Sequence, residues 1–164
     1  MICAALLALT ACSVKTRNSQ SADTTAAAAA APTAKGLFAK MKIKDTIKTG
    51  DSVLLKFTVY NTADTPMRFC KWHTPFEPLM SKYLDVKDAA GQQTDYRGPM
   101  AKRIMPPPAT SYITLKPNDS VAATADLLKA YAITKPGRYT VVYNSEGISG
   151  LKVTDSVSFV YAAR

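Results

Sequence analysis

The stretch VLLKFTVY, residues 53–60, carries the clearest structural signal in this sequence. In an extended chain, one face of this stretch would be uniformly apolar, because it consists of Val53, Leu55, Phe57 and Val59. A repeat of two residues is typical of a β-strand, whose successive side chains point to opposite faces of the sheet. We therefore predict a strand here, with its apolar face against a hydrophobic core.

The same short alternation continues on both sides of this stretch, with turn signals between the runs. Further strands are expected within residues 38–47, 67–73, 83–87, 111–115, 120–127, 138–143 and 153–161. Residues that favour turns separate them at 49–51, 61–66, 89–92, 116–119 and 135–137. This spacing predicts an all-β domain, an immunoglobulin-like antiparallel β-sandwich of about seven or eight strands. Residues 127–134 are expected to add a short helical turn.

Three single residues fit this architecture. Trp72 on the third strand is expected in the core, as sandwiches of this kind bury a tryptophan there. Tyr139 follows a Pro-Gly pair and is placed like a corner tyrosine, whose hydroxyl bonds to nearby backbone. Cys70 is the only cysteine beyond the first twelve residues, so we expect no disulfide in the domain and a buried Cys70.

Residues 1–12, MICAALLALTAC, form an apolar run that is shorter than the about 20 residues needed to cross a bilayer. The run is typical of a secretory signal. Its end, residues 9–12, resembles a bacterial lipobox, which implies cleavage before Cys12 and lipidation of that cysteine. The alternative is an ordinary signal peptide cleaved near Ala11. No basic residue precedes the run, which leaves a start upstream of Met1 open.

Residues 13–36 are rich in Ala, Ser and Thr and carry almost no larger apolar side chains. Such a segment cannot bury enough surface to offset the entropy of ordering. We expect a disordered tether that spans on the order of 25–30 Å and leads into a domain at residues 37–164. The expected location is a bacterial membrane, with the domain facing the periplasm or the exterior. In a cell with two membranes, Ser13 after the cysteine favours the outer one by analogy with lipoproteins.

The formal net charge is +9, but the basic residues are scattered. Lys40, Lys42 and Lys44 alternate along one expected strand, as on a solvated face. No basic cluster is interleaved with aromatic residues, so we do not expect a nucleic-acid partner.

The sequence contains few of the residues that catalytic sites usually require. It has a single histidine, His73, whereas a catalytic zinc ion usually takes three protein ligands. We predict no metal site, no cofactor, no catalytic residues and no enzymatic activity. A soft copper site made of Cys70 and methionines such as Met67, Met80, Met100 and Met105 is an alternative, but methionines without a tight repeat are expected to fill the core.

Residues 71–77, KWHTPFE, resemble the Lys-Trp-x-Thr-Pro-x-Glu motif in the N-terminal pro-domain of secreted aspzincin (deuterolysin-like) metallopeptidases. The resemblance extends in order through residues 61–66, 96–103, 112–121, 131 and 136–139, and covers roughly residues 38–144. Cys70 departs from the pattern, where an aliphatic residue is expected.

The resemblance implies a free-standing homologue of that pro-domain in a bacterial lipoprotein, since the sequence ends at Arg164 where the family continues into the peptidase. The implied function is to bind a secreted zinc metallopeptidase and inhibit or chaperone it in trans. The alternative is a structural or adhesive domain of the cell envelope. The candidate partner-binding residues are Lys71, Trp72, His73, Thr74, Pro75, Glu77, Tyr96, Lys102 and Arg103.

The residues of the motif also have structural interpretations. Lys71 and His73 are expected to point to the face opposite Trp72. Glu77 is expected to cap the next segment, to pair with Lys71 or to contact a partner. The proline run at residues 106–108 is extended and favours either a docking segment or a stiff connector.

Overall fold

The computed structural model describes residues 35–164. The predicted export signal, the lipidation site at Cys12 and all but the last two residues of the predicted tether lie outside the described residues. Those two residues, Lys35 and Gly36, are bonded to the turn that follows the third strand. Lys35 Nζ lies 3.0 Å from a carboxylate oxygen of Asp64, and the Gly36 carbonyl accepts hydrogen bonds from the backbone and hydroxyl of Thr62.

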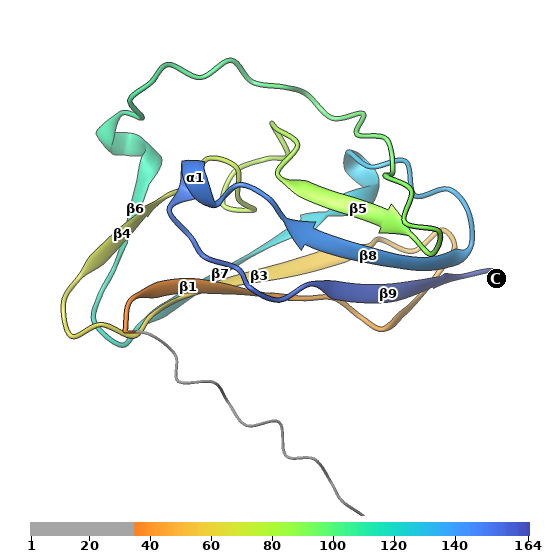
Figure 1. The fold of residues 1–164 in the computed structure, drawn as a ribbon, viewed down its shortest axis with the longest axis horizontal. Helices are drawn as coiled ribbons and strands as arrows, with labels where there is room; N and C mark the ends of the chain where they lie inside the picture. Colours follow the sequence, from red (N-terminus) through yellow and green to blue (C-terminus); the bar gives the residue numbers. More distant parts are fainter. Residues whose placement is uncertain (1–34) are drawn as a thin grey trace, which may run out of the picture. The chain divides into compact units, whose positions relative to one another are not determined.

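Within the described range, the chain forms nine strands with three short helical turns (Figure 1). The strands are β1 Leu37–Lys42, β2 Thr46–Lys48, β3 Leu54–Asn61, β4 Met67–Cys70, β5 Leu84–Asp88, β6 Tyr112–Leu115, β7 Ser120–Asp126, β8 Gly137–Tyr143 and β9 Val157–Ala162. The turns are the 3-10 helices η1 Ala109–Ser111 and η2 Leu127–Lys129 and the single helical turn α1 Glu146–Ser149.

Three sheets make up the fold. One has the order β1-β3-β7, a second has the order β2-β9-β8-β5, and β4 pairs with β6 in a third. All neighbours are antiparallel except β2 and β9, which run parallel. The prediction of an immunoglobulin-like β-sandwich is confirmed, and no disulfide is present within residues 35–164, where Cys70 is free and buried.

The core lies between the sheets and is built from the alternating faces that the sequence predicts. Val53, Leu55, Phe57 and Val59 are all fully buried. Lys40, Lys42 and Lys44 are exposed, as predicted for a solvated strand face. The short helical turn expected within 127–134 is found as η2, and Asp126 caps it by accepting a hydrogen bond from the Leu128 amide.

Two polar residues fix turns at the ends of strands. The Tyr139 hydroxyl donates to the carbonyl of Lys135 at 2.8 Å, which confirms the predicted corner tyrosine. Asn61 is buried, and its side-chain amide donates to the carbonyls of Thr65 and Lys116, both at 2.9 Å. Such fully bonded buried amides hold connections together, because an unpaired one would cost free energy.

Two of the predicted strands are found with different ends. The predicted strand 67–73 ends at Cys70, and the predicted strand 153–161 begins only at Val157. In the first case Pro75 lacks an amide proton and Thr74 bonds back to the chain, so residues 71–77 form a turn instead of continuing the ladder.

Candidate functional site

Residues 71–77, between β4 and β5, form a loop held by its own hydrogen bonds. The Lys71 amide donates to the carbonyl of Ser111 at 2.8 Å, and the hydroxyl of the buried Thr74 donates to the carbonyl of Lys71 at 2.6 Å. His73 has a backbone φ of 59°, a left-handed conformation that is uncommon for residues other than glycine. The strand alternation expected for Lys71, Trp72 and His73 is therefore absent, because the chain turns at these residues.

Trp72 and Glu77 of this loop form one compact cluster with Arg103, which comes from a distant segment. The Arg103 guanidinium carbon lies 4.7 Å from the centre of the Trp72 ring. Nη2 of Arg103 donates to both carboxylate oxygens of Glu77, at 2.7 and 2.8 Å, and Oε1 of Glu77 also accepts the His73 amide at 3.0 Å. Trp72 is buried as predicted. The expected pairing of Glu77 with Lys71 is wrong, since Arg103 supplies the cation.

His73 is bonded to the fold rather than presented as a free catalytic group. Its carbonyl accepts the Tyr143 hydroxyl at 3.0 Å, and its Nδ1 lies 3.3 Å from the Ser145 hydroxyl. Burial lowers the pKa of His73 and the Arg103 charge adds to this, while Glu77 opposes it. Burial also raises the pKa of the Cys70 thiol, so Cys70 is a poor nucleophile at neutral pH. No group of three potential metal ligands comes together within residues 35–164.

A second segment, residues 98–108, lies beside this loop, and we call it the strap. Its root is fixed by Tyr96, whose hydroxyl lies 2.9 Å from the carbonyl oxygen of Pro99 and 3.1 Å from that of Leu79. The Tyr96 ring packs edge-on against Tyr131, and a side chain at Gly98 would collide with the Tyr96 hydroxyl. Further along, the Ala101 amide donates to the Met80 carbonyl at 2.7 Å. The first residues of the strap are therefore anchored to the fold.

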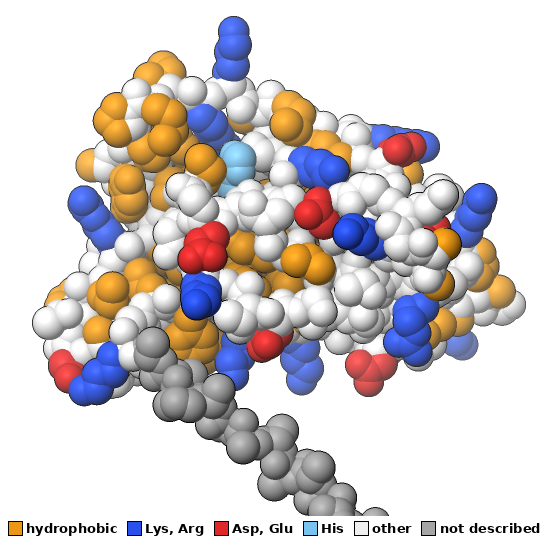
Figure 2. Space-filling view, viewed as in Figure 1, with side chains coloured by type: hydrophobic (Ala, Val, Ile, Leu, Met, Phe, Trp, Pro, Cys, Tyr) orange, Lys and Arg blue, Asp and Glu red, His pale blue; other side chains and the backbone are white. Residues whose placement is uncertain are grey.

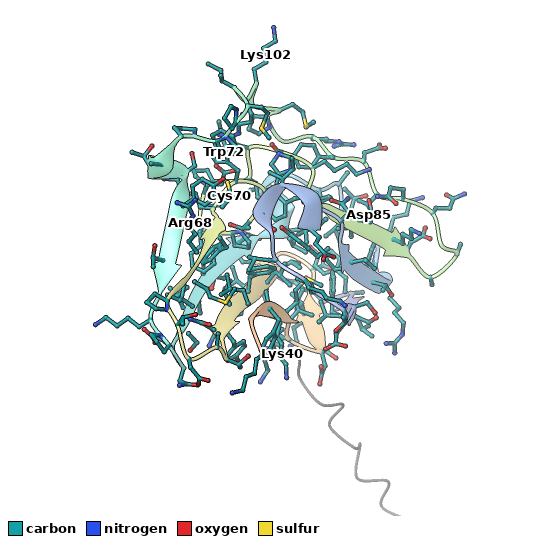
Figure 3. All side chains as sticks on the ribbon, turned by 60° about the vertical axis from the view of Figure 1, so that its left-hand side comes forward. Lys40, Arg68, Cys70, Trp72, Asp85 and Lys102 are labelled. Atoms are coloured by element: carbon teal, nitrogen blue, oxygen red, sulfur yellow. The ribbon has the colours of Figure 1, made fainter. Side chains whose placement is uncertain are left out.

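On both sides of Ala101 the strap presents apolar side chains to solvent. Exposed fractions are 71% for Met100, 85% for Ile104 and 60% for Met105, while Lys102 is also exposed. Figure 3 shows Lys102 pointing away from the body of the domain, above Trp72 and Cys70. Figure 2 shows hydrophobic side chains gathered at the upper left, over the side of the fold where the strap and η1 lie. Met100 and Met105 are thus surface residues, contrary to the prediction that the methionines fill the core.

The candidate residues from the sequence therefore separate into two groups. The first group consists of residues that are wholly or largely buried or that hold the strap in place. Trp72, Thr74 and Pro75 are buried, and the side chain of Glu77 is largely buried. Arg103 bonds the strap to the loop, and Tyr96 bonds the start of the strap to Leu79. In the second group, Lys102 is exposed, and Lys71 and His73 are half-buried. Sequence reasoning missed Met100, Ile104 and Met105. The available signal was three large apolar residues within a proline-rich stretch that has no strand or helix period.

Comparison with known proteins finds similarity to an extracellular protease and to solved β-domain structures. An extracellular protease of Aeromonas hydrophila is 29% identical over 110 residues. These residues are 67% of this chain and 30% of that protease, so the chain spans less than a third of its relative.

The CARDB domain of a Pyrococcus furiosus protein, solved with two metal ions, matches 78% of this chain and 87% of its own chain, at 12% identity and a TM-score of 0.37. A solution structure of the same domain matches at a TM-score of 0.33, 12% identity, covering 77% of this chain and 93% of its own. No family model matches. The chain is thus distantly similar to part of an extracellular protease.

Proposed function

We propose that this domain is a non-catalytic partner of a secreted zinc metallopeptidase of the aspzincin type, which it binds and holds inactive as a pro-domain does. The similarity to an extracellular protease over two thirds of the chain supports a functional link to such an enzyme. The pro-domain role rests on the resemblance of residues 71–77 and 96–103 to the aspzincin pro-domain motif.

The observation that carries the proposal is the strap. Three large apolar side chains stand 60–85% exposed on a short segment whose root is fixed to the fold. Soluble domains rarely gather such residues on a projecting segment unless they meet a partner. A segment that is bonded to the fold at several points loses less entropy on binding than a free one, which favours association.

The buried members of the motif have a supporting role in this proposal. Glu77 and Trp72 hold Arg103 between them, and Arg103 is the strap's charged link to the loop. Lys102 and the apolar residues beside it would then make the contact, as binding residues often stand on loops placed by a rigid scaffold. Inhibition would follow from steric blocking of the peptidase cleft, with no metal ligation by the domain.

The test is a titration of the purified chain against aspzincin peptidases, with peptide hydrolysis and complex formation measured in parallel. We expect inhibition that is weakened at least roughly tenfold by Ile104→Asp, since an apolar contact is replaced by a buried charge. Lys102→Glu should also weaken inhibition. Lys40→Glu is the matched control for charge, because Lys40 is exposed at the opposite end of the view from Lys102 (Figure 3).

Absence of both inhibition and complex formation with every peptidase tested would contradict the proposal and favour a structural or adhesive envelope domain. An effect of Lys40→Glu equal to that of Lys102→Glu would show that net charge, and not the strap, governs binding. A wild-type chain that cleaves peptides by itself would contradict the non-catalytic role.

We also propose export and lipid anchoring through Cys12, on the basis of the lipobox resemblance; similarity to an extracellular protease supports export. Cys12→Ala should release the protein from the membrane fraction of the producing cell. Continued sedimentation of this variant with membranes would contradict anchoring through Cys12.

A further inference from the structure

Strand β7 is an open edge of the sheet β1-β3-β7, and it lacks the features that usually protect such edges. Its seven residues, SVAATAD, pair with β3 on one side only. They include no Lys, Arg or Pro, and the register with β3 is continuous, without a bulge. The side chains on its inner face, Val121 and Ala123, remain partly exposed, as expected where no further strand covers them.

The register identifies the backbone groups that face outward. Asn61 bonds to Asp119, and Leu127 bonds to Val53, so the odd-numbered residues of β7 direct their amides and carbonyls toward β3. The even-numbered residues therefore direct theirs away from it. Ser120 has its amide bonded to the Asp119 side chain at 2.7 Å, whereas Ala122 and Thr124 have no hydrogen-bond partner for their outward groups among residues 35–164.

Other long edges of the described fold are covered or charged. Strand β1 bonds to Lys152 and carries Lys40 and Lys42, and the outer side of β5 is covered by residues 92–94. The remaining edge strands are short: β2 has three residues, and β4 and β6 have four each. Because proteins block edges in these ways to prevent association, the unblocked edge of β7 is a candidate for strand pairing.

We propose that two copies of this chain pair through β7, antiparallel about a two-fold axis at Ala123, to form one continuous six-stranded sheet. This register places Ala122 of each copy opposite Thr124 of the other. Both are even-numbered, so the four outward amides and four outward carbonyls at these positions meet in the correct phase for ladder hydrogen bonds. A two-fold interface needs a surface that complements itself, and the register about Ala123 satisfies this requirement at Ala122 and Thr124.

Side chains and charges permit this pairing. The residues that meet across the axis are small, and Asp126 of one copy faces Ser120 of the other, so no like charges are opposed directly. Lys56 lies on β3. In the paired sheet, the β3 strands of the two copies would be separated by three strand spacings, or roughly 14 Å. That separation exceeds the Debye length of about 8 Å at physiological salt, so the positive net charge of the domain opposes association only weakly there.

The experiment is sedimentation analysis of the full chain, produced without export and kept reduced, over a range of protein concentrations. We expect a concentration-dependent dimer that Thr124→Lys weakens by roughly tenfold or more, because it places two like charges beside the axis and disturbs the edge. Thr114→Lys on β6 is the matched control, since it makes the same change at another exposed strand position. Thr124→Pro, which removes one outward amide, should act like Thr124→Lys.

A cysteine scan tests the register independently of stability. Ala123→Cys, in a chain with Cys3→Ser and Cys12→Ser, should form an intermolecular disulfide on oxidation, since residues 123 would face each other at about 4.5 Å between Cα atoms. Ala122→Cys should not, because its two copies would lie roughly 8 Å apart. A wild-type chain that stays monomeric at every soluble concentration would overturn the proposal, as would a dimer unaffected by Thr124→Lys or one that cross-links equally at both cysteines.

Discussion

Arg103 is the residue on which the arrangement of the loop and the strap depends. It joins two segments 26 positions apart through the Glu77 carboxylate and covers the face of Trp72. Its side chain is 22% exposed and that of Glu77 is 8% exposed, so the charges are only partly solvated. Nε of Arg103 is buried without a hydrogen-bond partner in the described chain, which reduces the net gain from the pair. The main effect of the cluster is therefore to fix the strap against the loop, and its net contribution to the free energy of unfolding is smaller than its number of contacts would suggest.

We predict that Arg103→Ala lowers the free energy of unfolding by about 2–3 kcal/mol, because it leaves the Glu77 carboxylate buried without its cation. Arg103→Lys should lose less, since it keeps a charge but not the planar contact with Trp72. Urea denaturation measures both. Lys102→Ala is the matched control and should change stability by no more than about 0.5 kcal/mol, as an exposed residue. An equal loss in Arg103→Ala and Lys102→Ala would contradict the role of the cluster.

His73 is expected to make stability depend on pH. Burial holds the pKa of His73 in the folded chain below the ordinary value of about 6.5. As the pH is lowered, His73 of the unfolded chain is therefore protonated at a higher pH than His73 of the folded chain. The unfolded state then binds more protons, and stability should fall as the pH decreases from about 7 through the lowered pKa, then level off. His73→Asn should remove this component while tolerating the left-handed backbone at φ 59°. Denaturation midpoints of both proteins across this range provide the measurement, and parallel pH curves would contradict the assignment.

At the scale of elements, the strands divide into those fixed by the core and those left at edges. Strand β3 lies in the middle of its sheet, with its alternating face fully buried, so both of its neighbours depend on it. Strand β4 is only four residues long because the Thr-Pro turn ends it, and this brings residues 71–77 next to the strap. The strap itself has no regular structure and is held at Tyr96, Ala101 and Arg103.

Strand β3 provides the test of the core. Leu55→Ala should lower the free energy of unfolding by about 2–5 kcal/mol, because it removes apolar contacts and leaves a cavity at a fully buried position. Lys56→Ala, the next residue on the exposed face, should change it by no more than about 0.5 kcal/mol. Chemical denaturation compares the two, and similar losses would show that the alternation of β3 does not define the core.

At the scale of the whole molecule, the arrangement of sheets places the strap and the β7 edge on different elements. The proposed peptidase contact and the proposed dimer contact therefore use separate residues, and each can be removed alone: Ile104→Asp for the first and Thr124→Lys for the second. The formal charge of +9 acts on any encounter with a charged partner.

We predict that the association rate with an acidic peptidase falls as salt is raised, while the dissociation rate changes little. The reason is that long-range attraction steers the encounter and is screened by ions, whereas the apolar contacts of the strap hold the complex. Stopped-flow or surface-binding kinetics at several salt concentrations measure both rates. A dissociation rate that rises steeply with salt would instead indicate a complex held mainly by exposed ion pairs.

The sequence by itself determined the β-sandwich, the buried face of β3, the burial of Cys70 and Trp72 and the corner bond of Tyr139. These features follow from period-two alternation and turn residues, which act between neighbours in the chain and are visible without a structure. Only the tertiary structure decided that Glu77 pairs with Arg103, that Met100, Ile104 and Met105 face solvent, and that β7 is left without a second neighbour. Each of these depends on which distant segments meet once loops close, and local pattern carries no information about that choice.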